Sequence, residues 1–406
     1  MSEKENLKRL ARLIDGRQAW SEIPADEHWE IIHLARFHHV FPLLYRAMET
    51  GDAHANGILP ELNIEVLQHK ARSLLLAKTA AEVKQVLTRV EIPTLWFKGL
   101  ALAYTIYPAP WLRCMGDIDV LVPDEQSEFA LTQLIQAGFV NQFYETLGLQ
   151  LHDIKAHKEL VHHFTLFSKM KDAMVELHYD LSIRRISQLD VSILDWFWEH
   201  AHTVHTQQFG DLLVLDHESE LLLVAIHDIV QHQNLADQRN EVPGGFGLSR
   251  KYDLHLLVGQ DGLDWDMVFR QAKTFGWLDP FWIAIKQTHD YFGTPTNLDA
   301  LERELQTIYH ITYRNPLQDL VSLKTYRVAW RFFWHLSLHD KASFIWNRIL
   351  FIPEADIREI YGLSETQRVW SYHIRRIIQK TFSVFRLAIT LTVAQIKQKV
   401  KRDDDE

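Results

Sequence analysis

Two acidic residues separated by a single position are the clearest candidates for chemistry in this chain. Residues 117–122 alternate polar and apolar before Pro123, and this pattern predicts a β-strand. Alternate side chains of a strand share one face, so Asp117 and Asp119 would project together, roughly 7 Å apart. Such carboxylates repel each other unless a cation lies between them, and hard oxygen ligands favour Mg²⁺ or Mn²⁺.

A third carboxylate is commonly needed when two metal ions lie side by side. Residues 160–167 and 173–180 are both strand-like and are joined by a short polar segment, which predicts a hairpin. Glu176 shares one face of the second strand with His178 and Asp180. If this strand pairs beside residues 117–122, Glu176 approaches both aspartates across a strand spacing of about 4.8 Å.

Two cationic residues and a glycine close to this segment suit a nucleotide phosphate. Gly99 follows the short apolar run 94–97 and precedes a predicted helix over 100–107. A glycine at a helix N-terminus lets the backbone approach a phosphate closely. Lys98 and Arg113 would neutralise phosphate oxygens, the arginine through its planar fork.

These residues carry a resemblance to a known family. The stretch 96–103, then Tyr107-Pro108, Arg113 and residues 116–122, is similar to the bacterial uncharacterised nucleotidyltransferase family. That family belongs to the DNA polymerase beta type nucleotidyltransferase superfamily, and the likeness spans roughly residues 30–300. The chain departs from the superfamily at Leu100, where a serine or a second glycine is usual.

The resemblance implies a site and a reaction. It makes Asp117, Asp119 and Glu176 the catalytic metal ligands, and Gly99 the turn at the nucleotide phosphate, beside Lys98 and Arg113. The expected cofactor is Mg²⁺ or Mn²⁺, and the expected substrate is an NTP, ATP first. A nucleoside monophosphate would pass to an acceptor hydroxyl of a small molecule, glycan precursor or protein by a two-metal mechanism. The alternatives are a catalytically inactive nucleotide-binding scaffold and a phosphotransferase (kinase) on the same fold.

The elements that position these residues predict an α+β protein. We expect a polymerase-beta-like nucleotidyltransferase core, a small mixed sheet with helices, at residues 91–185. Helical regions would flank it at 1–90 and 186–345, and residues 234–247 would form a long loop. A C-terminal helical extension would cover residues 346–406.

The C-terminal extension carries an unusual charge pattern. Residues 366–402 contain nine Lys or Arg and no acid, with apolar residues interleaved. This pattern predicts a basic amphipathic helix that packs on the chain's own acidic domain. The alternative is peripheral contact with an anionic membrane or an acidic partner.

Histidines offer competing metal sites. His227-Asp228, with His232 and Asp253, is similar to a HD-type phosphohydrolase motif, but a clear upstream histidine is missing. Hydrogen bonding along a helix face is the simpler interpretation. His162 and His163 fall in a predicted strand, so they are expected to point to opposite faces and not to share a metal.

The composition of the chain excludes several other classes of protein. The chain has 406 residues, is 47% hydrophobic and carries a formal net charge of −10. General nucleic-acid binding is therefore not expected, because it needs clustered cations. The single cysteine, Cys114, excludes an intramolecular disulfide. The charged start and the lack of an apolar run of about 18 residues predict a cytoplasmic protein, with peripheral membrane contact as the alternative.

Overall fold

The computed structural model describes residues 3–50, 57–141, 162–170, 172–181, 193–229, 247–296 and 299. All of them lie in Met1–Asn315, the first of two units into which the chain divides. The predictions for the loop at 234–246, for His232 and for the extension at 346–406 fall outside the described residues.

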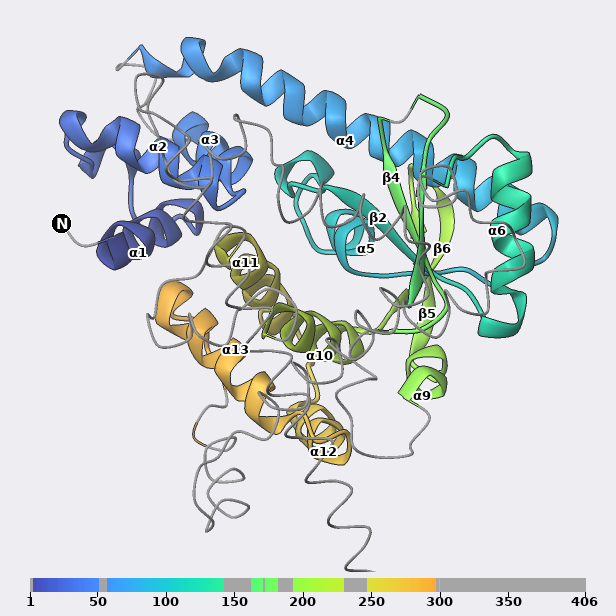
Figure 1. Ribbon diagram of the computed structural model, residues 1–406. Coiled ribbons are helices and arrows are strands. Elements are labelled where there is room, and N and C mark those ends of the chain that lie inside the picture. Colours follow the sequence, from blue (N-terminus) through green and yellow to red (C-terminus); the bar gives the residue numbers. More distant parts are fainter. Residues whose placement is uncertain are drawn as a thin grey trace, which may run out of the picture. The chain divides into compact units, whose positions relative to one another are not determined.

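A six-stranded mixed sheet forms the centre of the described part (Figure 1). Its strand order is β3-β4-β2-β1-β6-β5. The pairs β2–β4 and β1–β6 are parallel, and the other neighbours are antiparallel. The predicted α+β class is therefore confirmed. The strands are β1 Leu95–Trp96, β2 Asp117–Leu121, β3 His163–Phe167, β4 Met174–His178, β5 Ala201–Thr206 and β6 Gly210–Leu215.

Strands β2, β3 and β4 follow the sequence pattern. β3 and β4 form the predicted hairpin, and β4 pairs in parallel with β2. Ile118 and Val120 are fully buried on one face, as the alternation in β2 requires. The side chains at Asp117 and Asp119 therefore lie on the opposite face.

The expectation of helices alone from about residue 190 is wrong for residues 201–215. This segment forms the hairpin β5–β6, and β6 pairs in parallel with β1. A short apolar run such as 212–215 suits a buried helix or a buried strand equally well, so periodicity could not decide. Gly210, with φ +66°, closes the turn in a conformation that favours glycine. The sheet thus extends past residue 185, the expected end of the core.

Two helices cover the apolar face of the sheet. The helix α4 (Ile58–Arg89) runs for 32 residues beside β2 and contacts α6 (Ser127–Gln136), as Figure 1 shows. Side chains of α4 and α6 form one buried cluster with the inward residues of β2, β3 and β4. The helix α5 (Lys98–Thr105) follows β1 directly and packs against β2.

Helical regions precede and follow the sheet in the chain. The N-terminal helices are α1 (Glu3–Ile14), α2 (His28–Phe37) and α3 (Phe41–Thr50). The helix α9 (Ile193–Glu199) lies between β4 and β5 in the chain, and after β6 come α10 (His217–His227), α11 (Gly247–Val258), α12 (Trp265–Thr274) and α13 (Leu278–Phe292). Short 3-10 helices lie at Trp20–Glu22, Ala25–Glu27, Pro110–Leu112 and Asp124–Gln126.

The helices α10, α11 and α13 pack on one another. Asp216 begins α10 by accepting a hydrogen bond from the backbone N–H of Ser219 at 2.8 Å, a normal N-cap. Among the described residues, none of the helices has the length and apolar character that crossing a bilayer requires.

Candidate active site

The pairing of β2 with β4 brings the three predicted acids together. Asp119 lies directly opposite Glu176 across the parallel pair, and Asp117 precedes Asp119 on the same strand face. Asp119 is only 4% exposed, whereas Asp117 is half-buried. Three carboxylates therefore share a partly desolvated face of the sheet.

A histidine completes this group, and the sequence analysis did not assign it to the site. Nε2 of His178 lies 3.0 Å from Oδ1 of Asp119 and 3.3 Å from Oε2 of Glu176. Ligand atoms of Asp119, Glu176 and His178 all lie within 4.8 Å of one another, close enough to hold one metal ion. The signal was present in the sequence, because His178 lies two positions after Glu176 on the same strand face.

The two aspartates have opposite electrostatic environments. Burial, followed by the charges of Asp119 and Glu176, raises the pKa of Asp117 to about 6. Burial also acts to raise the pKa of Asp119, but Lys98 and the hydrogen bond with His178 lower it overall. Asp119 is thus held ionised by cationic partners. Asp117 has excess negative charge around it, the condition under which a divalent cation is stabilising.

Lys98 lies on the carboxylate group. Its Nζ is 3.0 Å from Oδ1 of Asp119, and both side chains are largely buried. Lys98 begins α5 with a left-handed backbone, φ +49°, which is uncommon outside glycine. The structure therefore places the expected phosphate ligand against an acid of the site.

The side chain of Arg113 is fixed by an acid of the helix α11. Its Nε and Nη2 donate to the two carboxylate oxygens of Asp253 at 2.9 and 2.8 Å. The hydroxyl of Tyr107 also donates to Asp253, at 2.6 Å. Nη1 of Arg113 faces Gly99, where an added Cβ would lie 3.2 Å from it. Two guanidinium nitrogens of Arg113 thus bind Asp253, while the third, Nη1, lies beside the predicted phosphate turn at Gly99.

Residues 25–293 match the family described as uncharacterised nucleotidyltransferase. The chain belongs to this family. The matched range contains the sheet, the acids and Asp253, and it agrees with the predicted likeness over roughly residues 30–300. A comparison with curated proteins gives no match.

This nucleotidyltransferase family member has a buried carboxyl group at the start of α5. Oε1 of Glu220, on α10, accepts the backbone N–H of Lys98 at 2.6 Å. Oε2 is buried and has no hydrogen-bond partner in the described part of the chain. Burial raises the pKa of Glu220 to about 8. Nothing local in the sequence distinguishes Glu220 from other acids of α10, so only its hydrogen bond to the start of α5 reveals it.

The HD-type hypothesis does not fit the described residues. Asp228 is buried and accepts from Arg250 at 2.6 Å and from Lys251. Asp253 is bound to Arg113. The two acids of the motif therefore pair with different cations, Asp228 with two and Asp253 with one, and do not point to one metal position.

The expectation that His162 and His163 point to opposite faces is wrong. β3 begins at His163, so His162 precedes the strand and its side chain does not follow the strand alternation. The two rings lie 4.6 Å apart between centroids. One ligand nitrogen from each of His162, His163 and His178 lies within 4.8 Å of the other two.

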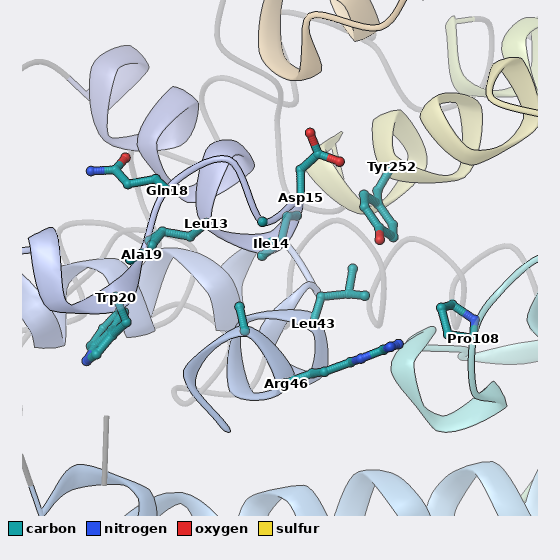
Figure 2. A pocket seen from close by; sticks show the side chains of 12 residues that line it. Leu13, Ile14, Asp15, Gln18, Ala19, Trp20, Leu43, Arg46, Pro108 and Tyr252 are labelled. Carbon is teal, nitrogen blue, oxygen red and sulfur yellow. The ribbon is translucent and has the colours of Figure 1, made fainter. Parts of the chain in front are cut away.

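Two further features lie outside the carboxylate group. Burial raises the pKa of the Cys114 thiol to about 12, so it is not a nucleophile at neutral pH. A cavity of about 460 Å³ is lined by residues of α1, of the segment that follows it as far as Trp20, and of α3, together with Pro108 and Tyr252 of α11. Figure 2 shows Arg46 reaching across it toward Pro108, with Tyr252 on the α11 side. Its lining includes none of the predicted site residues.

Proposed function

We propose that this protein transfers a nucleoside monophosphate from an NTP, expected to be ATP, to an acceptor hydroxyl. Asp117, Asp119 and Glu176 would be the catalytic metal ligands. The observation that carries the proposal is the register of β2 against β4, which sets Glu176 opposite Asp119 with Asp117 on the same face. Burial, and then the charges of the two neighbouring acids, raise the pKa of Asp117. This excess negative charge is what a bound divalent cation would neutralise.

The donor set fits a hard divalent cation. Asp119 and Glu176 would supply oxygen ligands that lie close enough to share one ion. Asp117, on the same strand face as Asp119, would add a further carboxylate, and Nε2 of His178 orients Asp119 from 3.0 Å. When bound at these residues, Mg²⁺ or Mn²⁺ would neutralise triphosphate charge and lower the pKa of the acceptor hydroxyl. The carboxylates would hold that ion on one face of the sheet, where it can receive the anionic triphosphate.

Lys98 provides a cation that can serve either an acid or a phosphate. In the structure its Nζ neutralises Asp119 at 3.0 Å. A divalent ion on Asp119 would take over that neutralisation, leaving the ammonium for the departing phosphate oxygens. Leu100 has no hydroxyl that could donate a hydrogen bond to the triphosphate. Lys98 would make the phosphate contact in its place, through its positive charge.

Arg113 and Gly99 together form a phosphate contact. Asp253 fixes two of the guanidinium nitrogens, so Nη1 is directed toward Gly99 without loss of side-chain entropy on binding. The absence of a Cβ at Gly99 leaves space in front of Nη1. A triphosphate oxygen in that space would accept a charge-assisted hydrogen bond.

The test uses labelled nucleotides. Full-length protein is incubated with Mg²⁺, a cell extract and NTP labelled at the α or the γ phosphate. The proposal expects α label in a product, and its loss in Asp119→Asn and Glu176→Gln, with Asp261→Asn as an exposed control. Label from the γ position alone would instead support a phosphotransferase. Thermal stabilisation by Mg·ATP without any transfer would support a nucleotide-binding scaffold.

A further inference from the structure

A cluster of three imidazoles adjoins the carboxylate group on its β3 side. His162 and His163 lie at the start of β3, and His178 ends the neighbouring strand β4, directly opposite His163. One ligand nitrogen of each lies within 4.8 Å of the other two. The ring centroids of His162 and His163 lie 5.5 and 5.0 Å from that of His178. We propose that these three histidines form a binding site for a transition-metal ion of the Zn²⁺ type, beside the carboxylates and in contact with them through His178.

The hydrogen bonding of His178 supports this role. Its Nε2 faces Asp119 and Glu176 at 3.0 and 3.3 Å, while its Nδ1 is buried and has no partner among the described residues. A metal-binding histidine commonly donates its other ring N–H to a carboxylate, which fixes the ring and makes it a better ligand. His178 has this arrangement, with one nitrogen engaged by acids and the other left over.

The type of ligand determines the type of metal. Three imidazoles suit Zn²⁺ and similar ions, whereas Mg²⁺ prefers oxygen. Zn–N bonds of about 2.0–2.1 Å place tetrahedral ligand nitrogens about 3.4 Å apart, so nitrogens that lie within 4.8 Å of one another need to close by at most about 1.4 Å. Side-chain rotation supplies this, and a water completes the fourth position. Any proton on the binding nitrogens leaves to solvent as the ion binds.

The neighbouring acids make a cation more favourable at the cluster. Nε2 of His163 lies 3.5 Å from Oε1 of Glu176, so the negative charge of β4 reaches the histidines. Through His178, the ion would also fix the orientation of Asp119. The histidine site would thus act as a support for the carboxylate face, and its occupancy does not require nucleotide.

The experiment measures zinc on the full chain in excess Mg²⁺, with no nucleotide present. Zinc content after equilibrium dialysis is expected to reach about one ion per chain. His162→Ala and His163→Ala should each weaken binding by at least about 100-fold, beyond the loss typical of an outer partner. His205→Ala, a 78% exposed side chain on β5, is the matched control and should bind as the unaltered protein does.

Two results would overturn the proposal. One is no zinc retained in excess Mg²⁺. The other is zinc lost in Glu176→Gln but retained in both histidine variants, which would place the ion on the carboxylates. If a variant fails to fold, X-ray absorption of the zinc-loaded unaltered protein decides. Imidazole scattering at about 2.0–2.1 Å supports the site, and an all-oxygen shell refutes it. Because this test involves no transfer, its failure leaves the proposed function standing.

Discussion

Arg113 and Asp253 lie 140 positions apart and form a two-pronged ion pair, with N···O distances of 2.9 and 2.8 Å. Asp253 is 2% exposed, and the carboxylate also accepts from Tyr107. The pair connects the segment before β2 to α11. The helical region thereby fixes the cation that faces Gly99.

Removing the carboxylate of Asp253 should be costly for both stability and nucleotide binding. Asp253→Ala leaves Arg113 as a buried, uncompensated charge, a change that typically costs about 3–5 kcal/mol. We expect that loss in the free energy of unfolding measured with urea, together with a higher KM for NTP. The exposed Asp261→Ala serves as the control. A variant as stable as the control would contradict a structural role for the pair.

A methyl group at Gly99 should separate folding from phosphate binding. Gly99→Ala favours α5 by about 1 kcal/mol through helix propensity. The new Cβ would lie 3.2 Å from Nη1 of Arg113, which Asp253 prevents from moving far. We therefore expect a stability within about 1 kcal/mol of the original protein, and a KM for NTP raised several-fold.

The matched substitution for Gly99→Ala is Gly116→Ala, because a Cβ at Gly116 meets nothing within 4 Å. It should leave KM unchanged. Equal effects of the two substitutions on KM would contradict a phosphate contact next to Gly99.

Glu220 should make the fold less stable as pH rises. Burial raises its pKa from 4.5 to about 8. Between these values the folded chain keeps a proton that the unfolded chain has released, so its contribution is present at low pH and lost by about pH 8. Glu220→Gln resembles the protonated form and should be more stable than the original protein by a few kcal/mol near pH 8.5.

Urea unfolding of the original protein and of Glu220→Gln at several pH values measures this difference. The difference should widen as pH rises and then level off. Glu218→Gln, on the same helix, controls for the substitution itself. A constant difference across the pH range would show that Glu220 is ionised in the fold.

Removal of a carboxylate should have opposite effects with and without metal. At neutral pH without divalent ions, Asp117→Asn relieves repulsion with Asp119 and Glu176 and should raise Tm. If Asp117 helps to hold Mg²⁺ as proposed, Mg²⁺ at about 100 times its Kd should stabilise the original protein by about 2.7 kcal/mol. The variant should gain much less from Mg²⁺.

Thermal unfolding of Asp117→Asn with Mg²⁺ or with a chelator checks both signs. Asp124→Asn, an acid after the end of β2, is the control. An equal Mg²⁺ response in Asp117→Asn and in the control would mean that Asp117 does not hold the ion.

The local patterns of the sequence determined the strand, its face and the acids on it. The period-two alternation of residues 117–122 fixed Asp117 and Asp119 on the side opposite Ile118. The same alternation placed Glu176 and His178 on one face of β4. Alternation is a property of each strand's own backbone, so it survives whatever the strand packs against.

Only the tertiary structure decided which of these residues meet, and which distant groups hold them. The pair Asp119–His178 spans 59 positions, Lys98–Glu220 spans 122, and Arg113–Asp253 spans 140. Residues 210–215 likewise form a strand of the central sheet because β1 pairs with them. Such contacts depend on how strands order in the sheet and how helices pack on it, and no local period in a sequence encodes that order.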